Sequence, residues 1–203
     1  MPVMTAVDRL LAGQPGQPRA DARRNLERLV AAARTAVAEV GVEVTAQEIA
    51  RRAGVGKGTF YRRISSREEL LRAVLEEVLD EIVGAADAAL AEPDAWQGFC
   101  EFATVYARLR AESCGLSDAL GASPGPELEQ TLGSIRDRIR TLAERAQAAG
   151  SMRTDITWQD VAFVLAGVTA ADHTLGFIAD DRQWDRNLRV ALDGLRARTG
   201  SGS

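Results

Sequence analysis

The sequence predicts an all-α protein of about nine helices, with an N-terminal helix-turn-helix domain followed by a second helical domain. Alanine, leucine, arginine and glutamate dominate the 203 residues and only six are proline, a composition that favours helix throughout. Apolar residues recur at helical spacing along most of the chain. Short stretches rich in glycine, proline, serine or aspartate separate these segments, as helix ends require.

The first helix is expected from about residue 20 to 41. Residues 1–18 are rich in Gly, Pro and Gln near their end and are expected to be disordered. The helix that follows has a buried stripe and ends at Gly41. The stripe consists of Leu26, Leu29, Val30, Ala33, Val37 and Val40.

Two short helices follow, joined by a turn that contains glycine. Thr45 caps the first of them, and Glu48, three residues on, completes a capping box. This helix stops at Gly54, which suits a left-handed helix end. The turn GVG leads to a third helix of about seven residues; Val55 of the turn packs inward, and Phe60 and Ile64 continue the apolar face. Two short helices joined in this way form a helix-turn-helix.

A long fourth helix begins after Ser65 or Ser66 and ends near Pro93. Its apolar positions are Leu70, Leu71, Val74, Leu75, Val78, Leu79, Ile82 and Val83. Five more helical stretches are expected at 95–112, 115–121, 126–149, 157–179 and 181–198. The resulting domains are a disordered segment 1–18, the helix-turn-helix domain 19–67, a second domain 68–198 and a disordered tail 199–203.

The charge is unevenly distributed. The net charge is −4, yet eleven basic and five acidic side chains lie between Arg19 and Arg67, so the acidic excess falls on the rest of the chain. A basic module on an acidic body is typical of a nucleic-acid binder with a separate sensing or assembly domain. The sequence lacks an 18-residue apolar run and a secretory signal, so no membrane association and a cytoplasmic location are expected.

The segment GVGKGT around Lys57 suggests a phosphate-binding loop, but the pattern does not fit one. A nucleotide loop requires a glycine at position 51 and a serine or threonine at position 58, which are Arg51 and Gly58 here. It also requires a preceding strand, whereas a helical pattern precedes these glycines. The outward side chains of the third helix are polar or basic, so we expect this helix to enter the major groove of DNA. They are Lys57, Thr59, Tyr61, Arg62 and Arg63.

Residues 45–71, TAQEIARRAGVGKGTFYRRISSREELL, strongly resemble the DNA-binding domain of the TetR family of bacterial transcriptional regulators. That family's pattern is roughly T-x-x-x-I-A-x-x-A-G-V-s-x-G-T-[LF]-Y-x-[HYR]-F-x-[SN]-K-x-x-L. This chain departs from it at Gly56 for a frequent serine, at Ile64 for a frequent phenylalanine, and at Arg67 for the usual lysine. The resemblance covers residues about 20–70, and beyond them only the layout of helices is similar.

The resemblance implies double-stranded DNA with an inverted-repeat operator as the partner, and a role as a repressor released by a small molecule. It implies phosphate contacts from Thr45, Thr59, Tyr61 and Arg67. It implies base or mixed contacts from Gln47, Lys57, Arg62 and Arg63, with Gly58 in the same helix. The alternative is that Thr45 only caps its helix and that the arginines form a solvated face.

The resemblance also places an effector pocket among the C-terminal helices. In segment 95–112, Trp96, Phe99, Cys100 and Tyr106 share one helical face. Phe163 and His173 could close a cavity over that face, which would suit a mostly hydrophobic ligand with one or two polar groups. Ordinary core packing is the alternative for this face. His173, the only histidine, could instead lie at a dimer interface.

The resemblance further implies a homodimer through the last two helices, whose small and apolar residues could otherwise pack within one chain. We find no triad or metal-protease spacing, so an enzyme, a cofactor and a metal are not expected. The alternative function is a helical interaction protein that keeps the fold but senses redox state or a metal through Cys100, Cys114 and His173.

Overall fold

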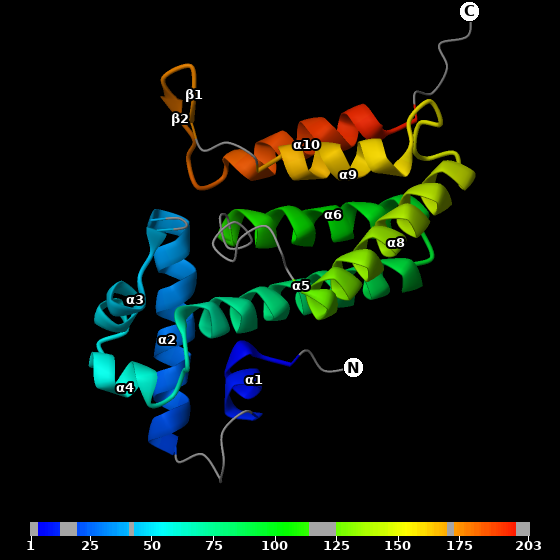
Figure 1. Cartoon of the computed structure of the whole chain (residues 1–203). Coiled ribbons are helices and arrows are strands. Elements are labelled where there is room, and N and C mark those ends of the chain that lie inside the picture. Colours follow the sequence, from blue (N-terminus) through cyan, green and yellow to red (C-terminus); the bar gives the residue numbers. More distant parts are fainter. Residues whose placement is uncertain (1–3, 13–19, 41–42, 114–124, 170–172, 198–203) are drawn as a thin grey trace, which may run out of the picture. The chain divides into compact units, whose positions relative to one another are not determined.

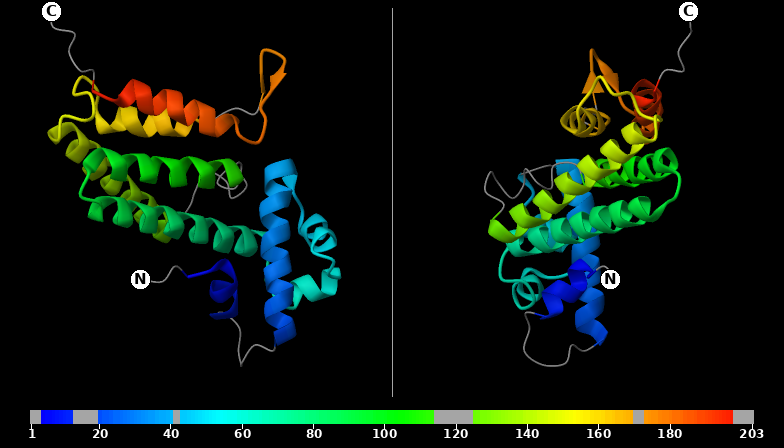
Figure 2. Two further views of the ribbon diagram at one scale, coloured as in Figure 1. Left: turned by 180° about the vertical axis from the view of Figure 1, so that it is seen from behind. Right: turned by 90° about the vertical axis from the view of Figure 1, so that its right-hand side faces the viewer.

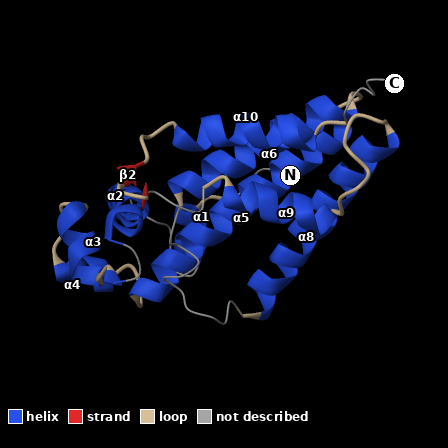
Figure 3. Cartoon of the chain, turned by 90° about the horizontal axis from the view of Figure 1, so that it is seen from above, coloured by secondary structure: helices blue, strands red, loops and turns tan. Residues whose placement is uncertain are grey.

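The computed structural model describes residues 4–12, 20–40, 43–113, 125–169 and 173–197. These ranges contain nine helices and two short strands, so the prediction of an all-α fold is confirmed for them (Figure 1). Figure 3 shows strand only in one small hairpin. The predicted helix 115–121 and the tail 199–203 lie outside the described residues.

The chain divides into two compact units. One comprises Met1–Glu81 with Glu112–Glu129, and the other comprises Ile82–Ala111 with Gln130–Ser203. The division falls within helix α5 (Arg67–Ala91) rather than at residue 67, because the first half of this helix packs with the N-terminal helices.

Helix α1 (Ala6–Ala12) was not expected, because residues 1–18 were predicted to be disordered. The Thr5 hydroxyl accepts a hydrogen bond from the amide of Asp8 at 3.1 Å, which caps the helix. Ala6, Val7 and Leu10 are buried, and Arg9 forms ion pairs with two carboxylates of α5, Glu76 and Asp80. Burial of this face explains why these seven residues form a helix, although an isolated helix of this length would not be stable in water.

The helix-turn-helix is formed by α3 (Ala46–Arg52) and α4 (Lys57–Tyr61), which lie beside α2 (Ala20–Val40). Gly54 has a φ of +67°, so the predicted left-handed helix end is confirmed. Around it, the Val55 amide donates to the Ala50 carbonyl at 3.0 Å and the Gly54 amide to the Arg51 carbonyl at 3.1 Å. These two bonds form a Schellman motif, which ends α3 and redirects the chain.

Helix α4 is held in place mainly by one buried face. Gly56 precedes the helix and provides no side-chain cap, and the helix has five residues rather than about seven. Phe60 is fully buried and Ile64 nearly so, whereas Val55 is only half-buried.

An ion pair connects the two long helices of this unit. Arg34 of α2 donates a hydrogen bond to Glu77 of α5 at 2.8 Å.

The second unit is organised around the end of α5, with α6 (Ala95–Glu112) and α8 (Pro126–Ala148). A Cβ atom added to Gly98 of α6 would lie 2.4 Å from the Ala89 carbonyl oxygen, so the helices meet where only glycine fits. Arg145 of α8 donates to the carbonyls at the end of α5, including Leu90 at 2.8 Å and Pro93 at 3.2 Å. The Leu90 carbonyl lies in the last turn of α5, where a helix leaves carbonyls without intrahelical partners, and the Pro93 carbonyl lies just beyond the helix.

The last two helices are shorter than predicted. Helix α9 (Trp158–Gly167) starts with the capping box of Thr157 and Asp160, and α10 (Gln183–Leu195) lies beside it (Figure 2). The predicted helix 157–179 is therefore wrong after residue 167. Strands β1 (His173–Thr174) and β2 (Phe177–Ile178) form an antiparallel hairpin between the two helices. Its turn contains Leu175 and Gly176, both with positive φ, a conformation that cannot continue an α-helix.

We expect Arg145→Met to lower the free energy of unfolding by about 1–3 kcal/mol, because partly buried carbonyl groups would lose a charged donor. Urea unfolding at a fixed protein concentration measures the change. Arg24→Met on α2 removes an equal charge from an exposed residue that pairs with Asp21, and should change stability by less than about 0.5 kcal/mol. Equal losses for both variants would show that the α5 carbonyls do not depend on Arg145.

Candidate nucleic-acid interface

Helix α4 presents its polar residues on the side opposite its buried residue, Phe60. Lys57, Gly58 and Arg62 are exposed, while Thr59 and Arg63 are half-buried. The Arg62 guanidinium donates to the Thr59 hydroxyl at 3.0 Å, which orders both side chains along the helix. Lys57 pairs with no acidic side chain in the described part of the chain, so its charge remains available.

Three residues that were predicted to contact phosphate line one hollow. Thr45 from the start of α3, Tyr61 from the end of α4 and Arg67 from the start of α5 lie around a space of about 430 Å³. The Tyr61 side chain is 49% exposed, and its ring packs edge-on against buried Phe60 at 5.1 Å. The lining also includes Glu43, Val44, Ala46, Ser65, Ser66 and Glu68. The fold therefore places a hydroxyl, a phenol and a guanidinium from three helices at one place.

The side chains around this hollow are fixed by local hydrogen bonds. The Thr45 hydroxyl accepts from the Glu48 amide at 3.1 Å, and the Ser66 hydroxyl accepts from the Glu69 amide at 3.1 Å. Arg67 is only 17% exposed and donates to Glu68 at 3.2 Å. Arg67 and Thr45 thus occupy defined positions. The serines were noted in the sequence only as caps of α5, so their place in this hollow was missed.

Glu48 holds the two arginines at the end of α3. Its carboxylate accepts hydrogen bonds from Arg51 at 2.7 and 2.9 Å and from Arg52 at 2.7 Å. These bonds lower the pKa of Glu48 to about 2. Arg52 also pairs with Glu39 of α2. Both charges are therefore balanced within the protein, in contrast to Lys57 of α4. Gln47, on the same helix, is exposed.

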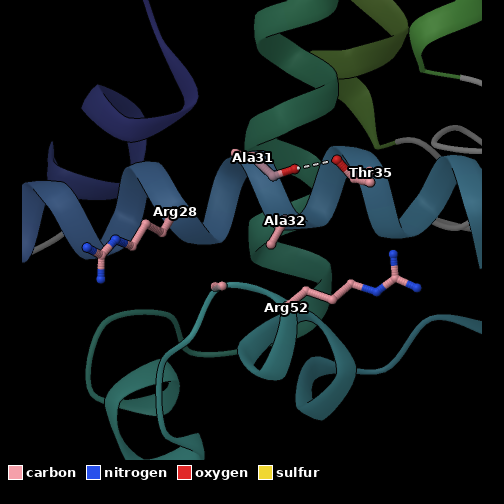
Figure 4. A pocket seen from close by; sticks show the side chains of 6 residues that line it. Arg28, Ala31, Ala32, Thr35 and Arg52 are labelled. Atoms are coloured by element: carbon pink, nitrogen blue, oxygen red, sulfur yellow. Dashed lines mark hydrogen bonds between the residues drawn. The ribbon is translucent and has the colours of Figure 1, made fainter.

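A second hollow, of about 450 Å³, lies between α2 and α3 and does not involve the predicted site residues (Figure 4). Ala31, Ala32 and Ala53 are among its lining residues, and the Thr35 hydroxyl is turned back to the Ala31 carbonyl. Arg28 and Arg52 also line it, and Arg52 is already paired with acidic side chains. We interpret it as the groove that small side chains leave between two packed helices.

The residues that were predicted to bind an effector fall into separate groups. Trp96 is half-buried and stacks on fully buried Phe99 at 5.7 Å, and the Arg196 guanidinium lies 5.7 Å from the Trp96 ring. Cys100 is half-buried. Burial raises the pKa of its thiol, and the Arg196 charge partly opposes that shift. Arg196 was missed by sequence analysis because it is distant in the chain and lies just after α10.

Tyr106 lies further along α6 in a second aromatic contact. Its ring is 5.7 Å from Phe102, and the Arg110 guanidinium is 5.8 Å from it. Ten residues separate it from Trp96, which corresponds to about 15 Å along a helix. Phe163 is 79% exposed and His173 is also exposed, so neither closes a cavity over α6 within one chain.

The α9–α10 region carries most of the exposed large apolar side chains of the described chain. Six of the eight such residues fall between positions 163 and 190. They are Phe163, Val164, Leu175, Phe177, Ile178 and Val190. The opposite faces of the same helices are buried through Val161, Leu165, Leu188 and Leu195. The two helices therefore have apolar side chains turned inward and further apolar side chains exposed to solvent.

Within the described ranges, no three His, Cys, Asp or Glu side chains gather in a way that could hold a metal ion. Cys114, one of the three residues in the redox or metal hypothesis, lies outside these ranges, while Cys100 is a free thiol. No described helix is long and apolar enough to span a bilayer.

Both the N-terminal and the C-terminal part of the chain match models of known protein families. Residues 29–74 match the family model of bacterial regulatory proteins of the tetR family, and residues 93–197 match the C-terminal domain of SbtR-like transcriptional regulators. No sequence among the curated proteins matches the chain.

Solved structures match most of the chain. A TetR transcription regulatory protein from Mycobacterium vanbaalenii is 31% identical, with 88% of this chain and 98% of that chain covered and a TM-score of 0.59. A TetR transcriptional regulator from Streptomyces coelicolor is 28% identical, with 86% and 99% covered and a TM-score of 0.62. The ketosteroid transcriptional regulator of Mycobacterium tuberculosis, at 16% identity, shares the fold, with 90% and 98% covered and a TM-score of 0.68. The chain belongs to the TetR family of bacterial transcriptional regulators.

Proposed function

We propose that this protein is a repressor that binds an inverted-repeat operator as a homodimer and leaves it when a small, mostly hydrophobic molecule binds its C-terminal unit. The observation that carries the DNA-binding part is the shared hollow of Thr45, Tyr61 and Arg67 beside the exposed face of α4. Family membership supports the same role. The protein would act in the cytoplasm, where bacterial DNA is found.

On DNA, the hollow would hold a backbone phosphate and α4 would enter the major groove. A hydroxyl, a phenol and a guanidinium can each donate to phosphate oxygens, and such contacts fix the protein's position without reading sequence. Lys57 and Arg63 could reach guanine, and Gln47 could pair with adenine. Thr59 and Arg62 bond to each other, so we assign Thr59 to the backbone and Arg62 to mixed contacts.

The dimer would form through α9 and α10. Phe163 and Val190 are 79% and 74% exposed in the single chain, and large apolar side chains exposed together mark an interaction surface. A twofold axis brings the same face of both chains together, so one apolar face is enough to make the interface. The two DNA-binding units would then meet two half-sites of opposite orientation.

The effector would bind along α6, between Trp96 and Cys100 near its start and Tyr106, about 15 Å further along the helix. The half-buried rings suit an aromatic or hydrophobic ligand. Arg196 adds a fixed positive charge beside Trp96, so a carboxylate or another acceptor is the polar group that fits best. Release would follow if the ligand binds more tightly to the conformation that binds DNA weakly.

Arg67→Ala should weaken binding to all DNA sequences by a similar factor and reduce the salt slope of log K by about 1, because one phosphate contact is lost. Lys57→Ala and Arg63→Ala should also change base preference, by about 1–3 kcal/mol at the affected position. Fluorescence anisotropy with operator and scrambled duplexes across a salt series measures both effects.

The matched control for these DNA variants is Arg140→Ala, which removes an exposed arginine of α8 that pairs with Asp137. Its salt slope and base preference should equal those of the unchanged protein. Full operator affinity and preference in both Lys57→Ala and Arg63→Ala would contradict the placement of α4 in the groove.

Substitution of the two tyrosines of the chain should affect DNA binding and the response to ligand separately. Tyr106→Ala should blunt release of DNA by ligand and leave affinity for DNA without ligand nearly unchanged. Tyr61→Ala should lower DNA affinity and leave ligand binding intact. A screen of hydrophobic aromatic acids, read by quenching of tryptophan fluorescence that Trp96→Phe abolishes, identifies the ligand. Inducers that are all highly charged and do not quench Trp96 would contradict the pocket assignment.

A further inference from the structure

The hairpin between α9 and α10 is an exposed apolar element. His173 pairs with Ile178 and Thr174 with Phe177, so each strand has only two residues. All six residues of the hairpin are exposed, and the exposed fractions of Leu175, Phe177 and Ile178 are 93%, 72% and 88%. Figure 2 shows the hairpin extending from one end of the α9–α10 pair.

Such a hairpin needs a surface to pack against. A two-stranded hairpin is marginally stable in water even when it is longer than this one. The described residues of the same unit cover none of the three large apolar side chains of the hairpin. An uncharged strand edge in solvent also invites pairing with other chains, which natural proteins avoid by charge or by covering. Segment 173–178, HTLGFI, contains no Asp, Glu, Lys or Arg.

The turn sequence indicates that the side chain of Leu175 makes a contact with another molecule. Leu175 and Gly176 have φ values of +48° and +82°, which places both central residues of the turn in the left-handed region. Asn-Gly is the favoured pair for such a two-residue turn, and leucine there is strained. A leucine that is strained in its backbone and 93% exposed contributes nothing to the folding of an isolated chain. It would contribute to a contact made by its side chain.

The residues next to the hairpin favour a second copy of this chain as its binding partner. The hairpin joins α9 to α10, and these helices expose Phe163, Val164 and Val190. The hairpin is therefore connected directly to both helices through which the proposed dimer forms. Interface centres are depleted in charged residues and enriched in aromatic ones, and the hairpin sequence has that character.

We propose that hairpin 173–178 is an intersubunit arm, which packs Leu175, Phe177 and Ile178 on a second copy of this chain. This inference rests on the proposed homodimer, and adds a contact outside the four helices of the interface. Each large apolar side chain buried by the arm should tighten the dimer by about tenfold or more.

Sedimentation equilibrium over a dilution series tests the arm. The unchanged protein should have about twice the 21.8 kDa chain mass. Leu175→Asn should raise the dimer Kd at least tenfold, although Asn-Gly suits the turn better than Leu-Gly. Phe177→Ser should have a similar effect. Far-ultraviolet circular dichroism should show unchanged helix content in both variants, because neither side chain is buried within the chain.

Two further variants separate failure of the arm from failure of the dimer. Phe163→Glu on α9 should yield monomers, whereas Thr141→Glu, an exposed position on α8, should leave the dimer intact. If Leu175→Asn and Phe177→Ser dimerise as the unchanged protein does while Phe163→Glu is monomeric, the arm is overturned and the dimer stands. A monomeric unchanged protein would overturn both. Altered DNA or ligand binding at an unchanged dimer Kd would overturn the arm and assign the hairpin to another partner.

Discussion

The candidate DNA interface depends on how α3 and α4 are held, because neither helix is long enough to form alone. Seven and five residues fall well short of the length at which an isolated helix is stable in water. Their position is set by burial of Ile49, Phe60 and Ile64 and by the left-handed turn at Gly54. The exposed face of α4, and its spacing from the hollow of Thr45, Tyr61 and Arg67, follow from those contacts.

Charge pairing then distinguishes the basic residues of this region from one another. Arg51 and Arg52 are bound by Glu48, whose lowered pKa shows how strongly its charged form is favoured. Because that pKa is depressed, the ion pairs are present at neutral pH and are lost only as the pH falls toward about 2. Lys57 remains exposed and unpaired among the described residues. A count of basic residues in the sequence cannot make this distinction, since it depends on which carboxylates lie within reach.

The helix-turn-helix could be predicted in detail because its determinants are local. The cap at Thr45, the glycine at 54 and the apolar spacing of Phe60 and Ile64 all lie within twenty residues. Helix α1 was missed, although the sequence TAVD at residues 5–8 contains the threonine and aspartate of its cap. Its burial depends on contacts with α2 and α5, which a local pattern does not reveal.

The C-terminal unit was predicted less well, for two physical reasons. The hairpin turn uses Leu-Gly rather than Asn-Gly, so its sequence carries a weak turn signal, and the apolar residues around it continue a helical pattern. Phe163 was predicted to close a cavity over α6, yet it is exposed in the single chain. Its environment would be set by a second chain, and spacing within one sequence cannot show that. The place of Arg196 beside Trp96 depends in the same way on long-range packing.

Selection of random double-stranded DNA by the purified full-length protein, followed by sequencing of the bound fragments, tests the central claim most directly. We expect enrichment of an inverted repeat whose half-site centres are about one DNA turn or more apart. We also expect that the Lys57→Ala protein enriches a repeat altered at the same position in both halves. Failure to enrich any sequence, or enrichment of an identical sequence by both the Lys57→Ala and the Arg63→Ala proteins, would contradict reading of DNA by the exposed face of α4.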